Sequence, residues 1–489
     1  MTNQVKVAAA KIAEQRSHLI PGKLKVTEHF FDVPKDYHNP TSGTIRLFAR
    51  SVRKHETPIE PSEDAAKKPD LPWMVYLNGG PGHPCRPPNA YPWTQTILDR
   101  GYQMLYLDQR GTGLSTPVTA TTLGLRGYNE TQAKYLKLYR ADSIVRDCEA
   151  IRLALTSTSP PYTTKSSSSA TSTSTSTSTG AAAAAAHGEP EGRKWSIMGQ
   201  SFGGFCAITY LSFYPSSLRE AFLFGGLQPL VTSPDAVYRS LYKKVIERNN
   251  AYYAKFPEDV ARVQSIVAYL RRFGDGAIKL PSEGALTARR FQQLGINLGF
   301  HGGVDVVHDI VLRASVDIEM FGHLTRGTQS AIDRATGFDD ALIYSILHEQ
   351  IYCVGEAARW SAERARKEFA EFEIREGERV FFTGEMIYSW MFEDYSELRR
   401  VAAAAQLVAE DADWPALFDI EQLNKNEVPV CAAAYTEDMY VDFEFSKETA
   451  KAIKGCKLWI TNVMYHDAVR EKMDDVMKEL FKLRDDVID

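Results

Sequence analysis

Hydrophobic and polar residues follow two different patterns in the first part of the chain. Residues 24–33 and 44–53 alternate apolar and polar side chains, which is typical of half-exposed antiparallel strands. Residues 73–77 and 103–107 are short continuous apolar runs, and such runs are typical of parallel strands buried on both faces. The chain is therefore predicted to contain both half-exposed antiparallel strands and buried parallel strands.

The alternation of strand-like and helical patterns continues beyond these strands. Residues 143–155 carry apolar side chains at helical spacing. Two further apolar runs, 195–198 and 221–224, flank an apolar segment at 205–211 that is compatible with a helix. Strands that alternate with helices in this way predict an α/β fold.

The middle of the chain has a different pattern. Across residues 230–422 helical periodicity dominates and strand-like runs nearly vanish, whereas strand character returns at 428–435 and 457–461. A helical block inserted between strands of one sheet is typical of a cap. We therefore expect a core built from residues 1–229 and 423–489, with 230–422 as a mostly helical cap domain.

Two segments fall outside this pattern. Residues 156–193 consist almost entirely of Ser, Thr, Ala and Gly. Such a segment buries too little apolar area to offset the entropy of ordering, so a disordered surface loop is expected there. Residues 1–19 mix charged side chains with alanines and lack the apolar core of a secretory signal. An amphipathic surface helix is expected for this second segment.

Composition and charge exclude several classes of protein. The 489 residues are 44% hydrophobic and 24% charged, as in an ordinary globular protein. A formal net charge of −5 argues against a nucleic-acid partner. No apolar run approaches the length of about 18 residues that a membrane-spanning helix needs. Neither nucleic acid nor a membrane is therefore expected as a partner.

The cysteine and histidine patterns argue against disulfides and metals. The six cysteines are widely scattered and form no C-x-x-C pair, which favours reduced thiols and a cytoplasmic location. His348 and Glu349 begin like the zinc motif H-E-x-x-H, but Tyr352 stands at the place of the second histidine. No metal site and no other cofactor are expected.

The most informative motif is G-x-S-x-G, which runs from Gly199 through Ser201 to Gly203. It follows an apolar, strand-like run and precedes a helix-compatible one, which is the setting of a nucleophile elbow. The flanking glycines remove side chains that would clash at so sharp a turn. Ser201 is therefore the predicted nucleophile of a serine hydrolase.

A serine nucleophile needs a base and an acid that orients the base. Only His466 follows the last predicted strand, in the loop where an α/β-hydrolase carries its base. The loop after the preceding strand offers three carboxylates. Asp438 is the predicted acid, with Asp442 as the main alternative and Glu437 as a weaker one.

The reaction also needs two backbone N–H groups that bind an oxyanion. The residue after the nucleophile, Phe202, is expected to supply one of them. The glycine-rich loop after strand 73–77 contains Gly79 and Gly80, and either of these is expected to supply the other.

Three sequence blocks together carry a family resemblance. They are Asn-Gly-Gly-Pro-Gly at 78–82, Asp-Gln-Arg-Gly-Thr-Gly-Leu-Ser at 108–115 and Gly-Gln-Ser-Phe-Gly-Gly at 199–204. The chain resembles the prolyl aminopeptidases (proline iminopeptidases) of the α/β-hydrolase fold, although Asn78 stands where the family usually has histidine. The resemblance implies a helical cap that recognises a free N-terminus. Small peptides with an N-terminal proline are the substrates that it implies.

Two glutamates of the predicted cap are candidates for binding the substrate ammonium group. Glu349 lies on an apolar helical stripe, where a carboxylate is costly unless it meets a cation. Its surroundings also resemble the family's amino-group-binding region. Glu385 lies in a segment rich in aromatic residues. For Glu349, the alternative is a carboxylate that is paired within the protein.

These observations predict a serine aminopeptidase that releases N-terminal proline through a prolyl-enzyme intermediate. The alternative is an esterase or amidase of the same fold that acts on a small non-peptide substrate, because a fold does not determine a substrate.

Overall fold

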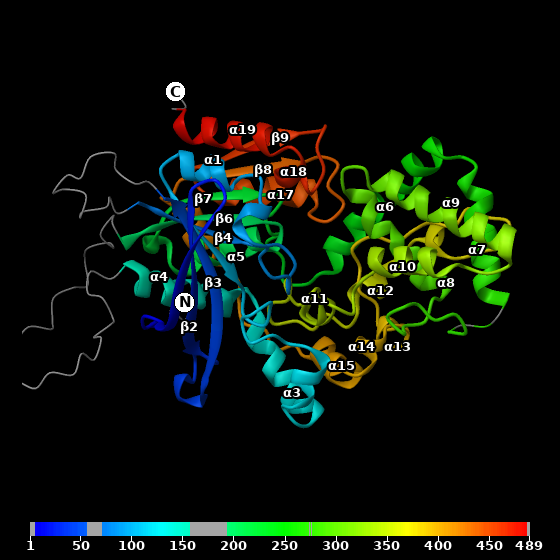
Figure 1. The fold of residues 1–489 in the computed structure, drawn as a ribbon, viewed down its shortest axis with the longest axis horizontal. Coiled ribbons are helices and arrows are strands. Elements are labelled where there is room, and N and C mark those ends of the chain that lie inside the picture. Colours follow the sequence, from blue (N-terminus) through cyan, green and yellow to red (C-terminus); the bar gives the residue numbers. More distant parts are fainter. Residues whose placement is uncertain (1–4, 56–70, 157–192, 273, 275, 487–489) are drawn as a thin grey trace, which may run out of the picture.

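The computed structural model describes residues 5–55, 71–156, 193–272, 274 and 276–486 (Figure 1). Apart from its ends, the predicted low-complexity loop lies outside the described residues, so the expectation of disorder there stays a prediction.

One sheet of nine strands runs through the described chain, in the order β1-β2-β3-β5-β4-β6-β7-β8-β9. The bounds of the strands are β1 Lys11–Ile20, β2 Leu24–Pro34, β3 Thr44–Lys54, β4 Trp73–Leu77, β5 Gln103–Asp108, β6 Trp195–Gln200, β7 Leu218–Phe224, β8 Val430–Tyr435 and β9 Cys456–Thr461. Strands from both ends of the chain thus form the same sheet, as the sequence pattern predicted.

The direction of the strands divides the sheet into two parts. The pairs β1–β2, β2–β3 and β3–β5 are antiparallel. From β5 through β4, β6, β7 and β8 to β9, every neighbouring pair is parallel. The mostly parallel sheet with helices on both faces is an α/β-hydrolase core, which confirms the predicted fold class.

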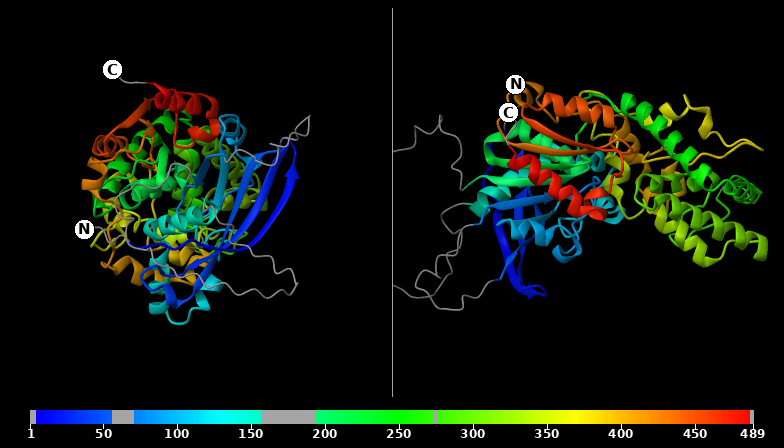
Figure 2. Two further views of the ribbon diagram at one scale, coloured as in Figure 1. Left: turned by 90° about the vertical axis from the view of Figure 1, so that its left-hand side faces the viewer. Right: turned by 90° about the horizontal axis from the view of Figure 1, so that it is seen from above.

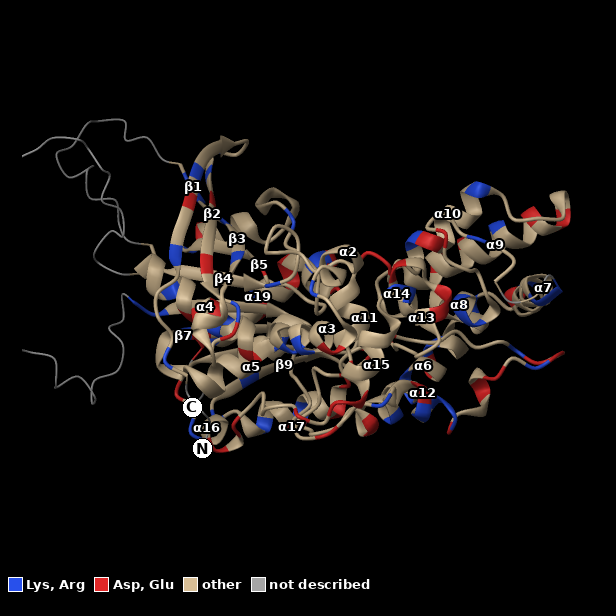
Figure 3. Cartoon of the chain, turned by 90° about the horizontal axis from the view of Figure 1, so that it is seen from below, with Lys and Arg blue, Asp and Glu red and all other residues tan. Residues whose placement is uncertain are grey.

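The expected helix near the N-terminus was wrong, because Lys11–Ile20 forms strand β1. This strand pairs with β2 along its whole length, so β2 satisfies one row of its backbone hydrogen-bonding groups. Most of its side chains are exposed, and charges of both signs lie along β1 and β2 (Figure 3). Charged side chains suit an edge strand because they discourage pairing with a further chain. Hydrogen bonding to the open edge of β2 therefore outweighed the helical preference of the local sequence.

Helices cover both faces of the sheet (Figures 1 and 2). Val75 and Leu77 of β4 point to the face covered by α4 (Ala141–Thr156) and α5 (Phe202–Phe213). Met74 and Tyr76 point to the opposite face, which is covered by α1 (Thr94–Asp99), α18 (Ala468–Glu471) and α19 (Met473–Asp485). Further helices of the core are α2 Ala120–Gly124, α3 Asn129–Leu136 and α17 Phe443–Ala452.

The chain between β7 and β8 is helical, and most of it forms a lobe beyond one end of the sheet (Figure 1). Its helices are α6 Asp235–Lys255, α7 Asp259–Arg272, α8 Ala288–Gln292, α9 Gly303–Phe321, α10 Arg326–Ala335, α11 Leu342–Leu347, α12 Ser361–Arg366, α13 Met391–Asp394, α14 Ser396–Arg399, α15 Ala402–Glu410 and α16 Ile420–Asn424. We call residues 230–422 the cap segment; the domain boundaries at these positions stay a prediction. Among the described helices, none has the length and hydropathy needed to cross a membrane.

Candidate active site

Ser201 lies at a sharp turn between β6 and α5. Its backbone has φ 53° and ψ −124°, a conformation that is costly for a residue with a side chain. Its N–H donates to the carbonyl of Phe224, at 3.0 Å. A Cβ atom on Gly203 would lie 2.0 Å from the carbonyl oxygen of Leu77. Glycine at this position therefore allows α5 to pack directly against the end of β4.

The predicted catalytic residues and the predicted oxyanion loop lie at one edge of the sheet. The predicted oxyanion loop, residues 78–82, follows β4, and the predicted nucleophile follows β6. The loops that carry the predicted acid and base follow β8 and β9. These strands are parallel to one another, so their carboxyl ends lie at the same edge. Ligand sites of open α/β sheets lie outside this edge.

His466 and Asp438 form a buried pair. The Nδ1 atom of His466 lies 2.7 Å from Oδ2 of Asp438. The other carboxylate oxygen accepts the N–H groups of Tyr440 and Val441, at 2.8 and 3.0 Å. Burial alone would lower the pKa of His466, but the charge and hydrogen bond of Asp438 outweigh burial and raise that pKa above 6.5. The pair thus favours the protonated form of the imidazole.

Gly225, which follows β7, leaves room for this pair. It has φ +51°, and a Cβ atom there would lie 3.2 Å from Nδ1 of His466 and 3.3 Å from Oδ2 of Asp438. A side chain at this position would strain the backbone and crowd the hydrogen bond between Asp438 and His466.

The two alternative acids make other contacts. Oδ1 of Asp442 accepts the N–H of Phe445 at 3.0 Å and caps helix α17, while Oδ2 accepts the hydroxyl of Ser240 at 2.5 Å. The carboxylate of Glu437 lies 3.9 Å from Nζ of Lys244. The geometry therefore favours Asp438 over both alternatives.

The predicted oxyanion loop lies against Ser201. A Cβ atom on Gly79 would lie 3.1 Å from Cβ of Ser201, and Gly80 lines the same cavity. Phe202 is the first residue of α5, where an N–H group has no partner within the helix. Gly79 and Phe202 thus adjoin Ser201, and Gly80 lines the cavity beside them.

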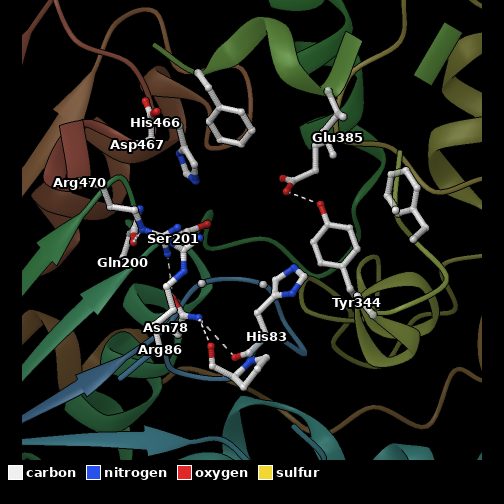
Figure 4. A pocket seen from close by; sticks show the side chains of 18 of the residues that line it. Asn78, His83, Arg86, Gln200, Ser201, Tyr344, Glu385, His466, Asp467 and Arg470 are labelled. Atoms are coloured by element: carbon white, nitrogen blue, oxygen red, sulfur yellow. Dashed lines mark hydrogen bonds between the residues drawn. The ribbon is translucent and has the colours of Figure 1, made fainter. Parts of the chain in front are cut away.

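A cavity of about 510 Å³ opens above these residues. Figure 4 shows Ser201 and His466 on one side of it, and Glu385 with Tyr344 on the other. The apolar residues that the cap segment contributes to its wall are Ile296, Phe300, Ala335, Phe338 and Ala341.

Glu385 is a largely buried carboxylate in this wall, with 16% of its side chain exposed. The hydroxyl of Tyr344 donates to its Oε1 at 2.5 Å, and Nε2 of His348 lies 3.8 Å from Oε2. Burial lowers the pKa of His348 to about 4, so its imidazole is neutral at pH 7. Burial also raises the pKa of Glu385 to about 7. The positive charge of protonated His466 opposes part of this effect of burial. Within the described chain, no lysine or arginine forms an ion pair with Glu385.

Two curated proteins resemble this chain along its whole length. The proline iminopeptidase aneH of Aspergillus aculeatus is 42% identical over 490 residues, which is 100% of both chains. A proline iminopeptidase of Aeromonas sobria is 36% identical and matches 96% of this chain and 99% of its own. This chain belongs to the proline iminopeptidase family.

Solved structures resemble this family member far less closely. The bromoperoxidase of Bacillus anthracis has a TM-score of 0.39 at 13% identity, with 93% of this chain and 99% of that chain covered. A hydrolase of Rhodococcus has a TM-score of 0.38 at 12% identity, with 96% and 98% covered. No family model matches the sequence.

In this proline iminopeptidase, Glu349 lies apart from the residues that line the cavity. Its carboxylate accepts the N–H groups of Ser361 at 3.0 Å and Ala362 at 2.8 Å, at the start of helix α12. A carboxylate is stabilised there by the helix dipole and by unpaired amides. This placement favours the alternative for Glu349, a carboxylate engaged within the protein, and leaves Glu385 as the stronger candidate for the ammonium group.

Tyr344 and Arg470 are among the polar residues of the cavity for which the sequence predicted no role. Tyr344 reaches Glu385 across 41 positions of the chain. Arg470 contacts residues of the elbow and the oxyanion loop that lie hundreds of positions earlier. Only the position of Arg470, four residues after the predicted base, could have drawn attention to it.

Proposed function

We propose that this protein is an aminopeptidase that releases N-terminal proline from small peptides. The names of its two relatives support the substrate. The observation that carries the proposal is the cavity itself, in which Ser201 and His466 lie opposite the Glu385 carboxylate, which forms no ion pair with a lysine or arginine of the described chain (Figure 4). A substrate whose ammonium group and reacting carbonyl lie close together could contact Glu385 with the first and Ser201 with the second.

In the acylation step, Oγ of Ser201 attacks the prolyl carbonyl and Nε2 of His466 takes the hydroxyl proton. The N–H groups of Phe202 and of Gly79 or Gly80 stabilise the oxyanion that forms. When the C–N bond breaks, His466 returns the proton to the leaving amine. The shortened peptide leaves, and a prolyl ester of Ser201 remains.

Water completes the cycle by the reverse order of proton transfers. His466 takes a proton from the attacking water, and the second oxyanion occupies the same N–H groups. Collapse of this intermediate breaks the ester, and His466 returns the proton to Ser201. Throughout both steps Asp438 keeps a proton on Nδ1 of His466, so that Nε2 is free to act as the base.

The cap segment supplies recognition of the substrate's amino end. Apolar side chains such as Ile296, Phe300 and Phe338 offer a surface for the pyrrolidine ring. Glu385 offers its carboxylate to the secondary ammonium group, and Tyr344 holds that carboxylate in place. An ammonium group would also stabilise the ionised form of Glu385, which burial disfavours.

Glu385→Gln should lower kcat/KM for a prolyl-arylamide about 10–150-fold. This range follows from the loss of a charge-assisted hydrogen bond, which contributes about 1.5–3 kcal/mol. Labelling of Ser201 by a small fluorophosphonate without an amine should remain at the wild-type rate. If labelling falls in parallel with hydrolysis, Glu385 supports the fold and the amine-binding proposal fails.

Glu349→Gln is a matched control, because burial raises the pKa of Glu349 to about 7 as well. Its contacts at α12 lead us to expect a lower melting temperature, with kcat/KM within about threefold of the wild-type value. If Glu349→Gln leaves the melting temperature unchanged but lowers kcat/KM as much as Glu385→Gln does, Glu349 is a second ligand of the ammonium group.

The pH dependence should reveal Glu385 separately from the base. In the free enzyme, both Glu385 and His466 must be deprotonated for reaction, and the pKa of each is raised. Below both values kcat/KM for a prolyl-arylamide should fall about 100-fold per pH unit, because two protons block the reaction. Fluorophosphonate labelling should fall only about tenfold per unit, because it needs only neutral His466. In Glu385→Gln the kcat/KM profile should have the shallower slope; equal slopes in both enzymes would contradict the proposal.

Two further parts of the proposal concern location and the competing activity. All six cysteines are described and free, which supports the predicted cytoplasmic location. An esterase or amidase would accept acyl groups without a free amine. Hydrolysis of acetyl esters at rates similar to prolyl esters would favour that alternative.

A further inference from the structure

Arg470 of helix α18 joins three segments of the site. Its Nε donates to Oε1 of Gln200, and its Nη2 donates to Oδ1 of Asn78, each at 3.1 Å (Figure 4). Gln200 directly precedes the nucleophile, and Asn78 opens the oxyanion loop. Arg470 itself lies one helical turn after His466. One guanidinium group thus holds the base, nucleophile and oxyanion segments together.

A second residue, Tyr76, also contacts the two amide oxygens that Arg470 binds. The hydroxyl of Tyr76, a fully buried residue of β4, lies 3.1 Å from Oδ1 of Asn78 and 3.1 Å from Oε1 of Gln200. With both oxygens held, the Nδ2 atom of Asn78 is directed back to the carbonyl of Pro84 at 2.9 Å. This last bond closes the oxyanion loop upon itself.

The charge of Arg470 is not neutralised by a neighbour. Both hydrogen bonds of its side chain go to neutral amides, and no carboxylate of the described chain pairs with it. Arg470 also lines the cavity beside Ser201, Gly79 and Gly80. A positive charge at this place favours the negative charge that develops on the substrate oxygen.

We propose that Arg470 is a positioning residue of this active site. It acts through Asn78 and Gln200 to hold the oxyanion donors in register with Ser201, and its charge stabilises the oxyanion. The inference rests on the proposed serine-hydrolase function but not on the choice of substrate. The role needs a forked donor, since a lysine ammonium group presents no planar pair of N–H groups to the two oxygens.

Arg470→Met should lower kcat for a prolyl-arylamide about 10–100-fold and leave KM within about threefold, because the lost interaction acts mainly in the transition state. Fluorophosphonate labelling of Ser201 should fall by a similar factor, since its phosphoryl oxygen occupies the oxyanion site. Arg470→Lys should lie between wild type and Arg470→Met. Arg313→Met, at an exposed arginine paired with Asp309 within helix α9, is the control and should change neither rate.

Chemical rescue separates positioning from a general structural role. In Arg470→Ala, millimolar guanidinium chloride should restore labelling at least about tenfold, while equal sodium chloride should not; His466→Ala should not respond. Wild-type labelling and kcat in Arg470→Met would overturn the proposal, as would a loss confined to KM. A loss in Arg470→Ala that guanidinium does not restore, in a protein that melts many degrees lower, would also overturn it. If Arg470→Ala does not fold, Arg470→Lys and Arg470→Met decide the question.

The labelling assay also keeps the two proposals apart. A wild-type protein that labels rapidly but does not cleave prolyl-arylamide would refute the proposed substrate and leave the comparison of Arg470 variants intact. Conversely, rapid prolyl-arylamide cleavage with no effect of Arg470→Met would refute only the role of Arg470.

Discussion

Ser201→Ala is expected to lower kcat for a prolyl-arylamide by about 10³-fold or more and to leave the fold intact. The substitution removes the nucleophile but keeps the strained backbone, because alanine carries the same Cβ atom. Steady-state kinetics and the melting temperature measure the two effects. Fluorophosphonate labelling should disappear altogether.

His466→Ala should cause a loss of similar size, and the double variant should lose little more. The two residues share one proton-transfer step, so removing either abolishes that step. Single losses that multiply in the double variant would show that Ser201 and His466 act independently, which would contradict the mechanism.

Asp438→Asn is expected to lower kcat about 10²–10⁴-fold. An asparagine can donate to Nδ1 of His466, which would leave the proton on Nε2, where the base must be free. The matched variant Asp442→Asn should cost much less activity, because Asp442 caps α17 and accepts a hydrogen bond from Ser240. It should instead lower the melting temperature by a few degrees.

The ranking of these two variants tests the acid assignment directly. If Asp442→Asn loses more activity than Asp438→Asn while both proteins remain folded, the acid is Asp442. The hydrogen bond between His466 and Asp438 would then be a feature of the resting protein rather than of the reaction.

Most of the fold could be predicted from the local spacing of apolar and polar residues in the sequence. The buried parallel strand β4 is a continuous apolar run, and burial on both faces favours that composition. Strand β1 was missed because its charged residues have no strand-like period, and its conformation depends on the open edge of β2. Sequence patterns therefore predicted the centre of the sheet better than its edge.

The same distinction applies to the site. The elbow around Ser201 is a local feature, because the glycines, the strand and the helix that make the turn are neighbours in sequence. The chain order of strands also pointed to His466 and to the loop that contains Asp438. These predictions need only the neighbours of each residue and the order of the strands along the chain.

Tertiary structure alone decided which side chains meet. The sequence left Asp438 and Asp442 as alternatives, and only the folded loop brings one of them within 2.7 Å of His466. It offered both Glu349 and Glu385, and only packing directs one to the start of α12 and the other into the cavity. Arg470 had no predicted role, because its partners lie 270 and 392 positions away. Periodicity and motifs record a residue's immediate neighbours, whereas contacts across such separations arise only when the sheet and the cap segment have packed.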